Sequence, residues 1–183
     1  MGWLKLVPMA LIAAQAGTLR GAEDLATDVQ RTGTVFSARA RATVDAPAAV
    51  AWKVLTDYDG LPRFIPGLTE SRVLARDANR VLVEQKGEAR FLIFSYPIEV
   101  RFEVRESPFE WVTSRGIAGN LRRMSGRYDL QTVGSRLQLR YTGEFEPDFD
   151  LPPLIGALAL RTMVEEQFTA MVDEIERRAA QAR

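Results

Sequence analysis

Residues 46–67 read APAAVAWKVLTDYDGLPRFIPG and contain two short apolar segments separated by a polar turn. Asp45 and Pro47 indicate a helix start, because aspartate caps helix amides well and proline is tolerated in the first helical turn. The polar residues 57–60 end that helix, and the Pro-Gly pair at 66–67 closes a second segment that is too short for more than one helical turn. The stretch therefore predicts a short helix and a separate helical turn joined by a tight connection.

The segments on either side of this stretch have the pattern of β-strands. Before it, residues 36–44 alternate between apolar side chains and polar ones such as Arg39 and Arg41, as expected for a strand with one buried face. After it, strand segments separated by turn residues cover 68–75, 80–86, 89–105, 109–117, 123–130 and 136–141. Because consecutive strands joined by short turns pair as hairpins, the sequence predicts an antiparallel sheet.

The C-terminal segment differs from the rest of the chain because its apolar residues recur every three or four positions. Residues 154–180 contain no proline, and Gly156 is their one glycine. The apolar stripe consists of Leu154, Leu158, Val164, Phe168, Met171, Val172, Ile175 and Ala179. This pattern predicts one long amphipathic helix. The predicted fold class is α+β, with a curved antiparallel sheet of about seven strands wrapped around the long C-terminal helix, and two short helices after the first strand.

The composition excludes several chemistries. The chain has 183 residues, of which 46% are hydrophobic and 26% charged, and it contains 24 basic and 24 acidic residues but no cysteine and no histidine. Such a chain cannot form a Ser-His-Asp relay, a thiolate nucleophile or a zinc site of the usual ligands. The balanced charge also argues against nucleic-acid binding, which normally requires a basic excess. We expect one folded domain without a cofactor or a nucleic-acid partner.

The N-terminus has the three parts of a secretory signal peptide. Lys5 supplies a positive charge, residues 6–14 form a short apolar core, and Ala14 and Ala16 give the small-residue spacing of a cleavage site. We assign a signal peptide to residues 1–16, a flexible leader to 17–33 and the folded domain to 34–183. The alternative is an N-terminal helix that packs in the core. A membrane anchor is not expected, since an apolar run this short does not span a bilayer. The predicted localisation is the bacterial periplasm or the secreted fraction.

Residues 46–67, the segment GNLRRMSGRYDL at 119–130 and the sequence Glu144-Phe145-Glu146 ahead of a long helix together carry a family resemblance. They resemble the START-like (SRPBCC) superfamily, on its branch of polyketide cyclase/dehydrase and coenzyme Q-binding proteins. The resemblance covers residues 34–180 and is more specific for fold than for function. It implies a helix-grip fold, with a cavity between the concave sheet face and the long helix in which members hold lipids, quinones, sterols or aromatic polyketides.

The side chains that we expect to line such a cavity are mostly large and apolar. They are Phe64, Ile65, Phe94, Phe102, Met124, Tyr128, Tyr141, Met163, Phe168 and Met171. Each one also fits the role of an ordinary core residue. Candidates for contact with a polar head group are the two tyrosines, Arg122, Arg161 and Gln167; Arg122 shares the alternate strand face of Met124. The alternative for Arg122 is a solvated position at a strand end.

Two groups of carboxylates have structural interpretations. Asp57 and Asp59 lie between the two predicted helices, where capping and turn formation explain them better than acid-base chemistry does. Glu144, Glu146, Asp148 and Asp150 form an acidic strand end that lacks the spacing of a calcium loop. We therefore assign no catalytic residue and no metal ligand.

Three functions remain open. The leading hypothesis is an exported, non-catalytic module that holds a hydrophobic small molecule such as a lipid or an isoprenoid quinone. The first alternative is an aromatase/cyclase-type enzyme, in which Tyr128, Tyr141 or Arg122 assists proton transfer on a polyketide-like substrate. The second is a partner-binding protein that uses the apolar segment 151–160, which is equally suited to transient membrane contact. The oligomeric state is not determined by the sequence.

Overall fold

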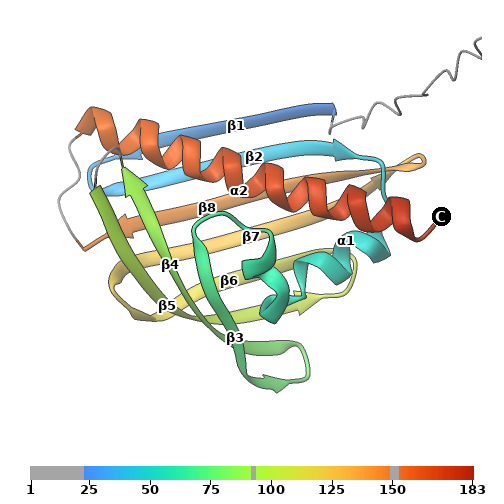
Figure 1. The fold of residues 1–183 in the computed structure, drawn as a ribbon, viewed down its shortest axis with the longest axis horizontal. Coiled ribbons are helices and arrows are strands. Elements are labelled where there is room, and N and C mark those ends of the chain that lie inside the picture. The colour runs from blue at the N-terminus through green and yellow to red at the C-terminus, as the bar shows by residue number, and fades with distance from the viewer. Residues whose placement is uncertain (1–22, 92–93, 149–152) are drawn as a thin grey trace, which may run out of the picture.

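The computed structural model describes residues 23–91, 94–148 and 153–183, and these form a curved antiparallel sheet with a long helix across one face (Figure 1). The strands are β1 (Glu23–Thr32), β2 (Val35–Val44), β3 (Leu68–Asp77), β4 (Arg80–Phe91), β5 (Phe94–Ser107), β6 (Trp111–Gly119), β7 (Leu121–Val133) and β8 (Arg136–Pro147). Their order in the sheet is β1-β2-β8-β7-β6-β5-β4-β3. The helices are α1 (Ala48–Leu55), the 3-10 helix η1 (Tyr58–Arg63) and α2 (Pro153–Gln181). The predicted α+β helix-grip fold is confirmed.

Strand β2 shows how an alternating sequence builds two different faces. Phe36, Ala38, Ala40, Ala42 and Val44 are buried on the side that α2 covers, and the residues between them lie on the opposite side. The strand pairs with β8 along its length, from Phe36 opposite Phe145 to Val44 opposite Leu137. The hairpin order that the sequence suggests therefore holds from β3 to β8, whereas the pairing of β2 with β8 is a long-range contact.

Strand β1 corrects two expectations. Residues 17–33 were expected to form a flexible leader, but Glu23–Thr32 forms an edge strand that pairs with β2 through a turn at Gly33, whose φ is 62°. The sheet consequently has eight strands within the described residues, not about seven, and the folded domain includes Glu23–Thr32. The strand was not recognised because an edge strand packs weakly and tolerates polar residues on both faces. The predicted signal peptide lies outside the described residues.

The predicted short helix and helical turn are confirmed as α1 and η1. Asp57 occupies the N-cap position of η1, but neither helix has a side-chain capping hydrogen bond. The N-cap of α1 is Pro47, and the carboxylate of Asp45 instead forms an ion pair with Arg183 at 2.9 Å. Asp57 accepts a hydrogen bond from Arg178 of α2 at 2.9 Å, and Asp59 accepts one from the backbone amide of Val73 in β3 at 2.8 Å. Both carboxylates therefore join η1 to other elements, which is a structural role.

Helix α2 provides the second layer of the fold. It contacts β1, β2, β4 and α1, and buries Leu160, Phe168, Val172, Ile175 and Ala179 against them. The predicted apolar stripe is confirmed from Val164 to Ala179. It is wrong at Leu158, which is exposed, while Leu160, which was not in the predicted stripe, is buried. Among the described helices, none has the length and apolar character needed to cross a membrane.

Candidate functional site

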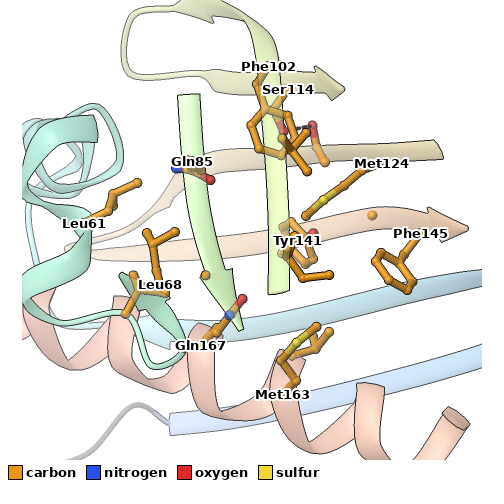
Figure 2. A pocket seen from close by; sticks show the side chains of 18 of the residues that line it. Leu61, Leu68, Gln85, Phe102, Ser114, Met124, Tyr141, Phe145, Met163 and Gln167 are labelled. Atoms are coloured by element: carbon orange, nitrogen blue, oxygen red, sulfur yellow. Dashed lines mark hydrogen bonds between the residues drawn. The ribbon is translucent and has the colours of Figure 1, made fainter. Parts of the chain in front are cut away.

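A cavity of about 260 Å³ lies between the concave face of the sheet and the N-terminal half of α2. Figure 2 shows Met163 and Gln167 reaching from α2 toward the sheet, where Tyr141 and Phe145 of β8 and Met124 of β7 face them. Leu61 of η1 and Leu68 of β3 border the cavity at its side. Residues from both the helices and most of the strands therefore form the cavity walls, and most of their side chains are apolar.

The floor of the cavity is a line of small residues that crosses four strands. Ser114 of β6 lies opposite Gly126 of β7, Gly126 opposite Gly143 of β8, and Gly143 opposite Ala38 of β2. All four line the cavity. We call these four residues the small-residue row. Because neighbouring side chains in direct register would otherwise meet across the sheet, their small size leaves space beneath α2.

Three aromatic rings flank the small-residue row. The ring centroids of Tyr128 and Tyr141 are 4.9 Å apart, and the ring of Tyr128 is stacked on Phe168 of α2 at 6.4 Å with an interplanar angle of 7°. Burial raises the pKa of both phenols above the ordinary value, and the proximity of Tyr141 raises the pKa of Tyr128 further. Both hydroxyls therefore remain protonated at neutral pH and can donate hydrogen bonds.

The other polar groups of the interior are neutral and mostly engaged. Gln85 donates to the Ser71 hydroxyl at 3.2 Å, and Gln167 of α2 donates to the carbonyl of Pro66 at 3.1 Å, which ties the helix to the end of η1. Ser114 donates a long hydrogen bond of 3.5 Å to the carbonyl of Gly126. These contacts fix the walls of the cavity without placing a charge inside it.

Charged residues border the cavity but have partners outside it. Lys86 forms an ion pair with Glu70 at 3.6 Å, Ser95 donates to Glu88 at 3.2 Å, and Glu144 pairs with Arg123 at 3.8 Å. In their strands these residues alternate with the inward-facing Gln85, Gly87 and Gly143. Among the described residues, no group of three His, Cys, Asp or Glu side chains is arranged to hold a metal ion.

Most of the predicted cavity residues come together in the structure. Those that line the cavity are Ile65, Phe102, Met124, Tyr128, Tyr141, Met163, Gln167, Phe168 and Met171. The side chain of Phe94 lies outside the described part of the structure, although its backbone belongs to β5. Arg161 is exposed on α2 and does not line the cavity. That any of these residues contacts a ligand remains a prediction.

Phe64 was predicted to face the cavity and does not. Its ring lies under the guanidinium of Arg178, with 5.9 Å between the guanidinium carbon and the ring centroid. It borders a separate polar groove with Asp57 and Glu174. The backbone turns away at the end of η1, so that Ile65 faces the cavity and Phe64 faces the C-terminal half of α2. A one-residue change of direction in a short irregular segment is not visible in periodicity.

Arg122 was a candidate for the cavity, with a solvated strand end as the alternative, and the structure places it in the solvated position. The pairing of β7 with β8 is irregular between Leu121 and Arg123, so the alternation that holds from Met124 onward does not extend back to Arg122. Its guanidinium donates to the carboxylate of Asp148 at 2.7 Å, in a pair whose side chains are more than half exposed. The aromatase/cyclase hypothesis therefore loses one of its three named residues.

The residues that create the space were not among the predicted site residues. Ala38, Ser114, Gly126 and Gly143 form the floor, and none was among the candidates. Two further lining residues, Phe36 and Phe145, fall on inward positions of β2 and β8 and could have been found from the alternation alone. The small residues gave no signal, because a glycine within a strand has no side chain to mark a face.

The sequence of residues 35–180 matches the family described as polyketide cyclase/dehydrase and lipid transport. Since the match spans more than half of the chain, the protein belongs to that family. The resemblance to the START-like superfamily is thereby confirmed. No curated protein sequence is significantly similar to this chain.

Solved structures from the same superfamily share the fold at low sequence identity. A STAR-related lipid transfer protein from Xanthomonas axonopodis has a TM-score of 0.67 and 15% identity, covering 85% of this chain and 96% of its own. The Zhui aromatase/cyclase from a Streptomyces species has a TM-score of 0.65 and 19% identity, covering 80% and 94%. A START superfamily protein from Mycobacterium smegmatis has a TM-score of 0.62 and 14% identity, covering 80% and 99%. These similarities concern the fold and do not select between carriage and catalysis.

Proposed function

We propose that this chain is an exported, non-catalytic binding protein that holds a hydrophobic small molecule, of the lipid or isoprenoid quinone class, between its sheet and α2. The observation that carries this proposal is the cavity of about 260 Å³ with apolar walls. An apolar cavity of about 150 Å³ is large enough to bind benzene, and ordinary small-molecule sites begin at roughly 300 Å³. The space therefore suits a ring system or one segment of a chain.

Apolar burial would supply most of the binding free energy. A ring system that loses about 200 Å² of apolar surface to this cavity gains about 5 kcal/mol, at about 25 cal/mol per Å². Met124 of β7 and Met163 and Met171 of α2 line the space, and their flexible thioether chains can adapt to ligands of different outline. Such a lining favours a carrier over a site that selects one rigid substrate.

The neutral character of the inward polar groups supports a non-catalytic role. Within the described lining these groups are glutamine, serine and tyrosine, and burial raises the pKa of all three lining tyrosines, Tyr58, Tyr128 and Tyr141. A phenol that stays protonated is a poor general base near neutral pH. The part of the proposal that concerns export rests on the signal-peptide pattern of residues 1–16.

The proposal is tested by expressing the full chain in a bacterial host and purifying it separately from the exported and the cytoplasmic fractions. Native mass spectrometry, followed by organic extraction, measures whether a small molecule is bound and identifies its class. We expect the exported form to lack residues 1–16 and to carry a stoichiometric apolar molecule. Cytoplasmic retention of the uncleaved chain would contradict export, and an empty cavity in every preparation would contradict carriage.

Two tryptophan variants of α2 provide a matched control. Met163 faces the cavity, whereas the adjacent Thr162 is exposed and its hydroxyl donates to the carbonyl of Leu158 at 3.2 Å. Met163→Trp should fill the cavity and abolish the bound mass, while Thr162→Trp should retain it. Equal retention by both variants would place the ligand elsewhere on the protein.

A further inference from the structure

The ring of Tyr141 rests on two glycines of the small-residue row. A Cβ added at Gly143 would overlap the hydroxyl oxygen of Tyr141 and lie 2.8 Å from its Cζ atom. A Cβ added at Gly126 would lie 3.2 Å from Cε2 and 3.3 Å from the hydroxyl oxygen of the same ring. The ring therefore lies along the sheet above these two positions and does not stand upright in the cavity. Any larger residue at Gly143 must displace the hydroxyl.

Three tyrosines line the cavity, and the hydroxyl of Tyr58 donates to Glu106 at 2.7 Å. The hydroxyls of Tyr128 and Tyr141 have no such hydrogen-bond partner among the described residues. In the same part of the chain, every polar side-chain atom that is sealed from solvent does have a partner. The hydroxyls of Tyr128 and Tyr141 are thus not sealed in the packing, and both residues line the cavity. Two donors that face an apolar space without an internal acceptor are suited to an acceptor on the ligand.

The surroundings favour an uncharged acceptor. The charged residues at the border, Lys86, Glu88 and Glu144, are engaged with Glu70, Ser95 and Arg123. A carboxylate placed beside the two tyrosines would have no cation to balance the cost of its desolvation. A carbonyl oxygen incurs a much smaller cost and accepts up to two hydrogen bonds.

From these observations we infer that the hydroxyls of Tyr141 and Tyr128 donate hydrogen bonds to a neutral carbonyl-type oxygen on an otherwise apolar ligand, and that Gly126 and Gly143 hold Tyr141 in the position to do so. The inference rests on the proposed carrier function and specifies its ligand class as neutral ketones, quinones or esters. Tyr141 and Tyr128 determine ligand orientation, and Gly143 is a positioning residue that acts through Tyr141.

The test uses three naphthalenes that carry an acetyl, an ethyl or a carboxylate group at the same ring position. Their affinities for the full chain and for the Tyr128→Phe, Tyr141→Phe and double variants are measured by titration calorimetry. We expect the double variant to lose roughly tenfold in affinity for acetylnaphthalene, since each hydrogen bond contributes modestly in exchange with water. Ethylnaphthalene binding should stay within about twofold, and naphthoate should bind the unaltered protein least well of the three.

The outcomes separate this inference from the function on which it rests. Equal changes for the acetyl and ethyl probes in the phenylalanine variants, or the tightest binding for naphthoate, would overturn the inference while leaving an apolar carrier intact. Binding of none of the three probes to the unaltered protein would overturn both. Thermal unfolding of each variant shows whether an affinity change results only from loss of folded protein.

The role of the glycine position is tested separately. Gly143→Ala should weaken acetylnaphthalene binding several-fold more than ethylnaphthalene binding, because the added methyl group displaces the Tyr141 hydroxyl. Thr142→Ala, one residue earlier on the outward face of β8, is the matched control and should change neither affinity. Adding Tyr141→Phe to Gly143→Ala should cause no further selective loss for acetylnaphthalene. A further selective loss would show that the glycine does not act through Tyr141.

Discussion

The two ends of the interface between α2 and the sheet are made from the same elements and packed in opposite ways. At the C-terminal end of the helix, Val172 and Ile175 meet Val44, Leu137 and Leu139 in a core where all five side chains are essentially inaccessible to solvent. At the N-terminal end, Met163 and Val164 cover the small-residue row and the cavity. Strands β2 and β8 run through both ends, so one pair of strands builds a filled core and an open space.

This difference shows how the fold divides stability from function. The filled end is also where the ionic contacts gather, because Glu174 accepts hydrogen bonds from Arg177 and Arg178, and Arg178 also reaches Asp57 beside η1. The cavity end is held to the rest of the protein by apolar contacts, by the hydrogen bond from Gln167 to Pro66, and by a long one of 3.5 Å from Thr27 of β1 to Glu165. Substitutions at the two ends should therefore have different consequences for the free energy of unfolding.

The largest loss of stability is expected from Ile175→Ala at the filled end. Ile175 is fully buried, and removing its side chain from a tightly packed site leaves a cavity that its neighbours cannot fill. We expect a decrease of about 3 kcal/mol in the free energy of unfolding, measured by urea denaturation. Ligand affinity should be unchanged in the variant under native conditions. A decrease below about 1 kcal/mol would contradict the close packing of side chains at the filled end.

Replacing two alanines on one face of β2 by leucine gives the sharpest comparison. Ala42 lies opposite Leu139 at the filled end, whereas Ala38 lies opposite Gly143 at the cavity end. Ala42→Leu should overpack the core and cost about 2 kcal/mol. Ala38→Leu should fill part of the cavity, increase stability by about 1 kcal/mol and weaken ligand binding. Destabilisation of similar size in both variants would remove the distinction between the two ends.

Glu174→Gln tests the ionic contacts and their pH dependence. Hydrogen bonds from Arg177, and then from Arg178, outweigh burial and lower the pKa of Glu174 from 4.5 to about 2. A lowered folded-state pKa means that the carboxylate stabilises the fold fully above about pH 4.5 and loses this effect as the pH falls through about 2. We expect a deficit of about 1.5 kcal/mol at neutral pH. Denaturation at several pH values should show this deficit shrinking toward pH 2, and a deficit that grows on acidification would contradict the assignment.

The smallest effect is expected from Met163→Ala. Met163 is only partly buried and already borders empty space, so its truncation enlarges a cavity without removing a close-packed contact. We expect a loss below about 1 kcal/mol by urea denaturation, well under the usual cost of truncating a buried methionine. Ile175→Ala at the filled end provides the comparison. A larger loss for Met163→Ala than for Ile175→Ala would reverse the order of the two ends.

Elements with a regular period have most of their inward-facing residues where the sequence pattern predicts them, and irregular segments do not. The helix pattern placed Phe168 and Met171 inward, and both line the cavity together with the predicted candidates Met163 and Gln167. The pattern failed at Leu158, which is exposed. The strand alternation succeeded for Met124, Tyr128 and Tyr141 because β7 and β8 pair regularly there. It failed for Arg122, where that pairing becomes irregular, and for Phe64, where the chain leaves a 3-10 helix. Edge strand β1 was missed because it packs weakly.

The sequence by itself determined the class of the fold, the two faces of the strands and the long helix, because these depend on local periodicity in side-chain polarity. It also excluded histidine and cysteine chemistry through composition alone. Only the tertiary structure decided where the cavity lies. Ala38, Ser114, Gly126 and Gly143 come from distant parts of the chain, and strand register aligns them across the sheet. Register depends on long-range strand pairing and on irregularities such as bulges, which local periodicity does not reveal. A cavity formed where side chains are small therefore leaves no pattern in the sequence.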